Sequence, residues 1–323
     1  MNISTITSTP KSRPFIWDGR YGIFLILVVL FAASSFFVSG FFSEANLTNV
    51  LRQITVVTML ALGATFVIIL GHINVAYGSL IALIGCVSCA VMVATGSVTL
   101  AVLAGLALGL AIGAANGLVI TRFGIPAFIM TLAVTTVARG AVLLFTGGMP
   151  IRGMGPAFLF IGQGYLGIFP VSVLILAGLF ILAWLLLNKT AFGRHVFAVG
   201  GNLNAAVASG INAKKVVVLA FVLDGLMSAV AGIVFMGRMN SGQPAAGVAY
   251  EFDAITAVVV GGTSLAGGSG SIVGTVIGAV IVGIINNVQN LMNINTYWQQ
   301  IVKGLIILVA VILDLMSKQG RKR

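Results

Sequence analysis

Long apolar runs, separated by short polar connections, make up most of the chain. The runs fall at residues 21–39, 51–70, 79–96, 99–121, 126–146, 170–187, 216–236, 254–262, 271–291 and 298–316. A helix needs about 20 apolar residues to cross the roughly 30 Å of hydrocarbon in a bilayer, and most of the runs approach this length. Because unpaired backbone polar groups are costly in lipid, spans of this kind are helical. The pattern predicts an all-α polytopic membrane protein of about ten transmembrane helices.

One long polar stretch lies in the interior of the chain, at residues 188–215, with the sequence NKTAFGRHVFAVGGNLNAAVASGINAKK. Composition supports the membrane class, because 59% of residues are hydrophobic and 7% are charged, whereas about a quarter of the residues in soluble domains are charged. The net charge of +11 does not indicate a nucleic-acid partner, since the basic residues are spread between the apolar runs. We expect a single membrane domain over 21–316 that carries loop 188–215, with tails at 1–20 and 317–323.

The distribution of basic residues predicts the orientation of the chain in the membrane. If the N-terminus is cytoplasmic, most of the 17 lysines and arginines face the cytoplasm, namely Lys11, Arg13, Arg20, Arg122, Lys189, Arg194, Lys214, Lys215, Lys318, Arg321, Lys322 and Arg323. Short cytoplasmic loops carry an excess of such residues. We therefore expect both termini and loop 188–215 to be cytoplasmic.

Within that loop the sequence predicts a short surface helix. Asn202 is suited to begin a helix and Gly210 to end one. Leu203, Ala206 and Val207 then fall on one face, which suits docking into a groove of a partner. A solvated connector whose basic residues only anchor it to the inner leaflet is the alternative.

Glycine, with 41 residues, is expected to be the main packing device. Two sets recur every four positions: Gly105, Gly109, Gly113 and Gly117 in the fourth run, and Gly270, Gly274 and Gly278 in the ninth. This spacing places them on one helix face, where another backbone can approach closely. The expectation is close helix contact within the subunit, with a dimer interface as the alternative.

Two glycine-broken segments, GHINVAYGS at 71–79 and GGTSLAGGSG at 261–270, interrupt the apolar pattern in the two halves of the chain. Paired interruptions of this kind mark a transport path, because irregular backbone at membrane depth survives only inside protein or beside water. The candidate path residues are His72, Asn74, Tyr77, Ser79, Gly261, Gly262, Thr263 and Ser264. Two tight loops at the membrane surface are the alternative interpretation.

The chain lacks the residue patterns of an enzyme. It has two histidines and six acidic residues, no HExxH, no GxSxG and no lysine preceded by glycine, so the end of a phosphate-binding P-loop is missing and no bound cofactor or metal is expected. Cys86 and Cys89 lie within an apolar run and are interpreted as packing residues rather than a redox pair.

Two charged residues fall near the middle of apolar runs, Arg139 in the fifth and Asp224 in the seventh. An unpaired charge at the centre of a span costs at least about 2.5–3.5 kcal/mol. We expect the two side chains to pair with one another; a proton relay, as in a secondary transporter, is the second interpretation.

Three segments carry a resemblance to a known family: GIPAFIMTLAVTTVARG (124–140), AVGGNLNAAVASGINAKK (198–215) and EFDAITAVVVGGTSLAGGSGSIVGTVIGAVIVGIINN (251–287). They resemble the permease subunits of ribose-type monosaccharide ABC importers, in the branched-chain amino acid/sugar permease superfamily, from about residue 40 to the C-terminus. The family pattern commonly reads GGIDLSVGS where this chain has GHINVAYGS, so His72, Asn74 and Tyr77 depart from it. These departures leave open a different sugar preference or a heterodimer.

The resemblance implies a multi-pass protein of the bacterial inner (cytoplasmic) membrane. It implies a second permease subunit in a homodimer or heterodimer, a cytoplasmic ATPase that binds the ATP, a periplasmic sugar-binding protein and the lipid bilayer as partners. Carried over by position, the residues that contact the ATPase are Gly201, Asn202, Ala205, Ala206, Gly210 and Ile211. A branched-chain amino-acid permease, and an uncoupled sugar channel or secondary carrier, are the rival readings.

Overall fold

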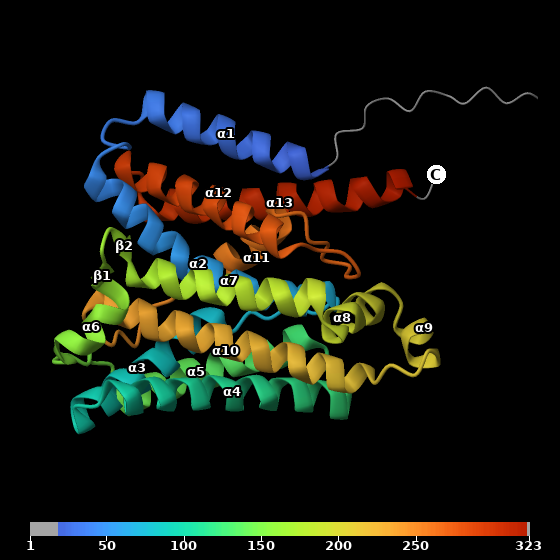
Figure 1. The fold of residues 1–323 in the computed structure, drawn as a ribbon, viewed down its shortest axis with the longest axis horizontal. Coiled ribbons are helices and arrows are strands. Elements are labelled where there is room, and N and C mark those ends of the chain that lie inside the picture. Colours follow the sequence, from blue (N-terminus) through green and yellow to red (C-terminus); the bar gives the residue numbers. More distant parts are fainter. Residues whose placement is uncertain (1–18, 322–323) are drawn as a thin grey trace, which may run out of the picture.

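The structure, a computed structural model, describes residues 19–321 and is a bundle of helices that lie side by side along its long axis (Figure 1). The helices are α1 (Gly19–Phe37), α2 (Glu44–Ile69), α3 (Tyr77–Thr95), α4 (Val98–Phe123), α5 (Ala127–Thr146), α6 (Gly155–Gln163), α7 (Val171–Lys189), α8 (Ala191–Gly201), α9 (Leu203–Ala208), α10 (Ala213–Met239), α11 (Tyr250–Val260), α12 (Ile272–Leu291) and α13 (Thr296–Arg321). Strands β1 (Tyr165–Leu166) and β2 (Phe169–Pro170) form a two-stranded antiparallel hairpin.

Each of the ten apolar runs coincides with a helix, so the predicted all-α membrane architecture is confirmed. Seven helices, α2, α3, α4, α5, α7, α10 and α12, are long and apolar enough to cross a membrane. Helices α1 and α13 contain shorter apolar stretches, and α11 has only 11 residues. The count of ten crossings and the orientation of the termini therefore remain predictions.

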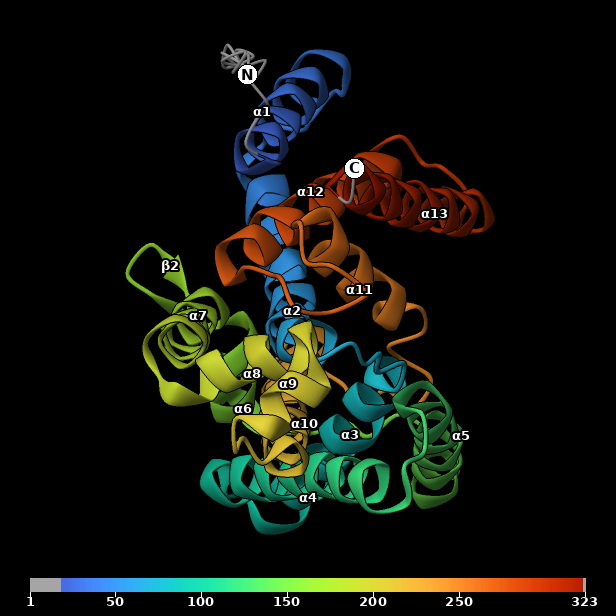
Figure 2. The same cartoon turned by 90° about the vertical axis from the view of Figure 1, so that its right-hand side faces the viewer.

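Helices α2 and α10 form the centre of the bundle. Viewed from the end that carries α8 and α9 (Figure 2), they lie between α4 and α5 on one side and α12 and α13 on the other. In the most apolar part of α2, 89% of the residues are buried, against 17% in α5 and in α7. The outer helices thus expose most of their apolar surface, as lipid-facing helices do.

The two ends of the bundle carry different elements. Helices α8 and α9 and the last turns of α13 lie at one end, and α6 with the β1–β2 hairpin lies at the other (Figure 1). Residues 1–18 and 322–323 lie outside the described part, and with them most of the predicted tail 1–20. Helix α13 continues to Arg321 and so includes most of the predicted tail 317–323, and the domain boundary at residue 316 stays a prediction.

Close glycine contacts join α4 to α3 and α10. Gly105, Gly109, Gly113 and Gly117 are all buried. A Cβ atom added to Gly109 would lie 2.6 Å from both the Gly225 carbonyl oxygen and the Ala229 Cβ. Within the chain, these glycines therefore serve the predicted close packing of helices.

The second glycine set is not one helical stack. Gly274 and Gly278 lie in α12 against the backbone at the end of α11, whereas Gly270 precedes α12 and lies against Ile69 of α2. The helix begins only at Ile272, because the Ser271 hydroxyl caps it by accepting the N–H of Gly274. Cys86 and Cys89 are buried together in the apolar core, on α3.

Candidate functional site

Two irregular segments run into the bundle and each ends where a helix begins. Residues 70–76 lead to α3, and residues 240–249 lead to α11. The starts of these two helices meet at Gly78 and Gly247, where a Cβ added to Gly247 would lie 3.0 Å from the Gly78 Cα. A Cβ added to Gly78 would also lie 2.8 Å from Glu251 Oε2, so the Glu251 carboxylate, at the start of α11, packs against Gly78. The first turns of α3 and α11 therefore form one packed junction between the two halves of the chain.

Asp224, near the middle of α10, binds the first irregular segment. Its Oδ2 accepts a 2.6 Å hydrogen bond from Asn74 Nδ2, and its Oδ1 accepts a 2.9 Å hydrogen bond from the Tyr77 hydroxyl. Asn74 also accepts the N–H of Ala76 through its own Oδ1, at 2.8 Å. Asp224, Asn74 and Tyr77 are 1%, 2% and 0% exposed, so water does not screen these bonds. Hydrogen bonds to a charged group in such surroundings are the strong ones.

The same segment is bonded on its other side to α5. The Thr131 hydroxyl accepts the N–H of Val75 at 3.2 Å, and the Thr135 hydroxyl donates to the Val75 carbonyl at 3.0 Å. The backbone of residue 75 is therefore tied to α5, while its neighbours are tied to α10 through Asp224. The segment bridges these two helices.

Arg139, on α5, binds the second irregular segment. Its Nη1 donates to the carbonyl oxygens of Pro244 and Ala246, at 2.6 and 2.9 Å. The predicted pair of Arg139 with Asp224 was wrong for this structure, because each charge has its own partners. The physical reason is that irregular backbone offers unpaired carbonyls to an arginine, and nearby amide and phenol groups satisfy a carboxylate.

At the end of the bundle that carries α8, three glycine-containing segments converge. The N–H of Gly268 donates to the Ile69 carbonyl of α2 at 2.8 Å. Gly267 and Gly268 lie against the backbone of Gly200 and Gly201, where α8 ends. The glycine block 261–270 thus closes on the end of α2 and on the segment that leads into α9.

The predicted short surface helix is present as α9. The Asn202 side chain accepts the N–H of Ala205 at 3.0 Å, and Gly210 follows the helix with a φ of +82°. Leu203 and Val207 are 53% and 55% exposed, whereas Ala206 is buried. The expected apolar face is therefore divided, with Ala206 packed against the bundle and two large side chains directed away from it. Of the other positions carried over, Gly201 and Asn202 are exposed and Ile211 is half-buried.

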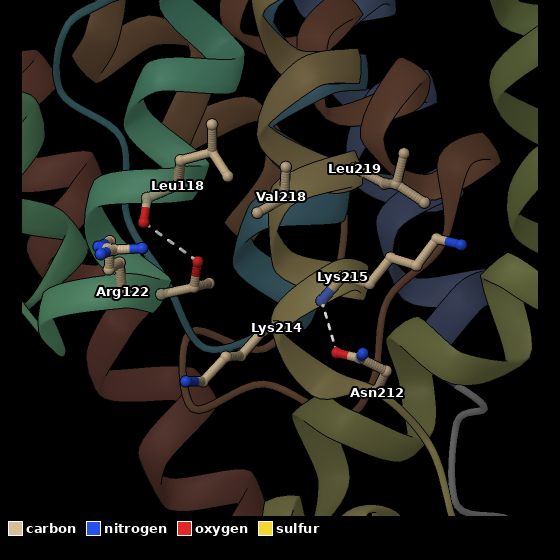
Figure 3. A pocket seen from close by; sticks show the side chains of 8 residues that line it. Leu118, Arg122, Asn212, Lys214, Lys215, Val218 and Leu219 are labelled. Carbon is tan, nitrogen blue, oxygen red and sulfur yellow. Dashed lines mark hydrogen bonds between the residues drawn. The ribbon is translucent and has the colours of Figure 1, made fainter.

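A basic pocket lies beside this loop, between the end of α4 and the start of α10 (Figure 3). The cavity has a volume of about 470 Å³ and is lined by Leu118, Thr121, Arg122, Asn212, Lys214, Lys215, Val218 and Leu219. Arg122 and Lys214 extend toward the same side, while Lys215 points away. Helices α4 and α10 thus bring together basic residues that lie far apart in the sequence.

The family described as branched-chain amino acid transport system / permease component matches residues 46–311. The chain belongs to this family. The ribose import permease protein RbsC of Bacillus subtilis is 43% identical over 297 residues, which cover 91% of this chain and 92% of that protein. RbsC of Escherichia coli (strain K12) is 42% identical over 316 residues, with 95% and 98% covered.

The L-arabinose transport system permease protein AraH of Escherichia coli is 37% identical over 307 residues, which cover 95% of this chain and 93% of that protein. No solved structure matches the chain. Members of this permease family are transport subunits, and the seven apolar helices make this member a multi-pass membrane protein.

The residues of the predicted path are buried to different degrees. Ser79, Thr263 and Ser264 are buried, as are Asn74 and Tyr77, and His72 is half-buried. Gly261 packs against Gly274, and Gly262 is exposed with a φ of +86°. The role of these residues in a path stays a prediction.

Sequence reasoning missed segment 240–249, which contacts the first break at Gly78, whereas 261–270 contacts it at Gly71. The signal was available in Gly242, Pro244 and Gly247, since such residues interrupt helices, and in the shortness of the apolar run that follows.

Proposed function

We propose that the chain is the permease subunit of an ATP-driven importer that passes a monosaccharide, delivered by a binding protein, across the bacterial cytoplasmic membrane. The observation that carries this proposal is the identity with ribose import permeases over almost the whole length of both chains. The arabinose permease relative makes pentoses the first substrates to test. A separate cytoplasmic subunit binds the ATP, and a second permease subunit completes the membrane part.

The end that carries α8, α9 and the basic pocket is the cytoplasmic end in this proposal. Arg122, Lys189 and Lys214 all belong to helix ends or loops on that side, in agreement with the excess of basic residues in cytoplasmic loops. Both described ends of the chain, the start of α1 and the end of α13, lie on the same side (Figure 1).

Helix α9 is the contact to the ATPase in this proposal. Leu203 and Val207 give it two exposed apolar side chains on a short, capped helix, which suits insertion into a groove. Asn212 caps the start of α10 only four residues after the end of α9, so the docked helix leads directly into the central helix of the bundle.

The test is uptake by the complete importer in proteoliposomes. The chain is reconstituted with its ATPase, and uptake of labelled ribose, arabinose, xylose and leucine is measured with binding protein outside and ATP inside. We expect uptake of a pentose that requires both ATP and binding protein. Pentose uptake that needs neither would establish a channel or carrier, and uptake of leucine alone would establish an amino-acid permease.

A matched pair of variants tests the contact itself. Leu203→Ala removes an exposed apolar side chain from α9, and Leu174→Ala removes one that is 40% exposed on α7, away from this loop. We expect the first to weaken co-purification of the ATPase and the second to leave it intact. Equal retention of the ATPase by both variants would contradict the proposed docking.

A further inference from the structure

The buried carboxylate of Asp224 has two donors that both come from the segment entering α3. Asn74 and Tyr77 reach it at 2.6 and 2.9 Å, and the three side chains are at most 2% exposed. An ionisable side chain in the interior of an apolar bundle is costly, so its presence there points to a function for the group. These contacts hold α10 to the irregular segment that leads into α3.

Helix α10 connects this group to the short loop 209–212 that follows α9. It runs from Ala213 to Met239 as one helix, and Asp224 lies eleven residues from its start, or about 16 Å at about 1.5 Å per residue. A Cβ added to Gly63 of α2 would lie 2.9 Å from the Asp224 Cα, so the carboxylate also lies where α10 and α2 are in close contact. A tilt or shift of α10 therefore displaces Asp224 together with the helix.

The segment is at the same time attached to α5. Thr131 and Thr135 bond the backbone of Val75, and Arg139 of the same helix bonds the carbonyl of Ala246 in the second irregular segment. When α10 moves relative to α5, the hydrogen bonds to Asp224 and those to the threonines cannot both keep their geometry unless residues 73–77 move. The start of α3, which meets Gly247, then moves with them.

We propose that Asp224 is a positioning residue for transport: through Asn74 and Tyr77 it transmits movement of α10, driven from α9, to the junction where α3 and α11 begin. This inference rests on the proposed importer function. In this inference Asp224 passes the motion that the ATPase drives on to the junction of α3 and α11. Other residues contact the substrate.

The experiment exchanges the amide and the carboxylate. Asn74→Asp places two carboxyl groups where one hydrogen bond of 2.6 Å now joins an amide to a carboxylate. Asp224→Asn places two amides there and removes the charge that Tyr77 donates to. The double variant restores one amide and one carboxylate with their positions reversed. Each variant is reconstituted with the ATPase and binding protein, and pentose uptake and ATP hydrolysis are measured on the same vesicles.

We expect each single variant to lower the amount of sugar moved per ATP hydrolysed by about tenfold, which corresponds to about 1.4 kcal/mol. The double variant should return the ratio close to that of the wild-type protein. The control is Ser228→Ala, one turn further along α10, because Ser228 is equally buried and its hydroxyl has no hydrogen-bond partner among the described residues. This control should keep the wild-type ratio.

A purely structural role would lower the yield of folded protein while leaving the ratio of uptake to hydrolysis unchanged, and that result overturns the inference. A double variant whose ratio of uptake to hydrolysis is no higher than that of the single variants also overturns the inference. If the exchanged variants cannot be purified, Tyr77→Phe removes only the donor hydroxyl, and an unchanged ratio in this variant also overturns it. A wild-type complex without ATP-dependent pentose uptake would instead refute the proposed function.

Discussion

Replacing Gly109 by alanine tests whether the contact between α4 and α10 is as close as the structure has it. The added Cβ would lie 2.6 Å from the Gly225 carbonyl oxygen and 2.6 Å from the Ala229 Cβ, whereas ordinary van der Waals contact begins at 3.4 Å. The difference of 0.8 Å cannot be relieved by rotating a flexible side chain, because the first neighbour is backbone and the second is a Cβ. The two helices must therefore separate.

The expected magnitude follows from two opposing contributions. Forcing an extra methyl group into a packed interior costs about 1–3 kcal/mol. Alanine is preferred over glycine inside a helix by about 1 kcal/mol, which offsets part of this cost. Gly178→Ala in α7 isolates the second contribution, because nothing lies within 4 Å of the Cβ that would be added there. The two variants should differ by about 1–3 kcal/mol, with Gly109→Ala the less stable.

The assay is thermal unfolding of the purified protein in detergent, followed by loss of the monodisperse peak. At about 2–4 °C per kcal/mol, the Gly109→Ala variant should unfold about 2–12 °C below the Gly178→Ala variant. Equal midpoints for the two variants would refute the reasoning, because they would mean that α4 and α10 are not in backbone contact at this glycine.

Three further predictions concern the loop and the second irregular segment. Gly200→Ala should sharply reduce the yield of folded protein, since its Cβ would overlap the Ile69 carbonyl. The control Gly201→Ala, whose added Cβ would lie 4.0 Å from its nearest neighbour, should keep the wild-type yield and unfolding temperature. Equal yields of the two variants would contradict this prediction. Ala206→Pro removes the hydrogen bond from the Ala206 N–H to Asn202 in α9, so pentose uptake should fall at least about tenfold while the ATPase still hydrolyses ATP, and preserved coupling would show that force does not pass through α9. Arg139→Met leaves the carbonyls of Pro244 and Ala246 without their donor and should lower stability by about 1–3 kcal/mol, with partial recovery in Arg139→Lys; a midpoint unchanged from wild type would count against the role given to Arg139.

The helices of the bundle could be predicted because their signal is local. An apolar run of sufficient length has one stable form in lipid, and all ten runs became helices. Helix α9 was predictable for a similar reason, since Asn202 caps it and Gly210 follows it with a left-handed φ. Helix α8 was not predicted, because its sequence AFGRHVFAVGG mixes polar and small residues and its position depends on contact with the end of α2.

The partners of the intramembrane charges could not be predicted, because they belong to segments whose positions depend on the whole fold. From the sequence, Arg139 and Asp224 stood out as the charges near the middle of long runs, and pairing them was the simplest way to neutralise both. Nothing in the sequence distinguishes the carbonyls of Pro244 and Ala246 from other backbone carbonyls as partners for an arginine. Only the folded chain shows that these two are available to an arginine on α5.

The two intramembrane charges solve the same physical problem at two places. Irregular backbone inside an apolar bundle lacks the hydrogen bonds that a helix supplies to itself, so side chains must satisfy it or fix its course. Arg139 supplies donors to residues 244–246, and Asp224 supplies an acceptor to the side chains of Asn74 and Tyr77. The segment that holds Asn74 is bonded to α10 through Asp224 and to α5 through Thr131 and Thr135, whereas residues 244–246 are bonded to α5 through Arg139. A relative movement of α5 and α10 therefore changes the junction at Gly78 and Gly247, whereas movement of the bundle as one body does not.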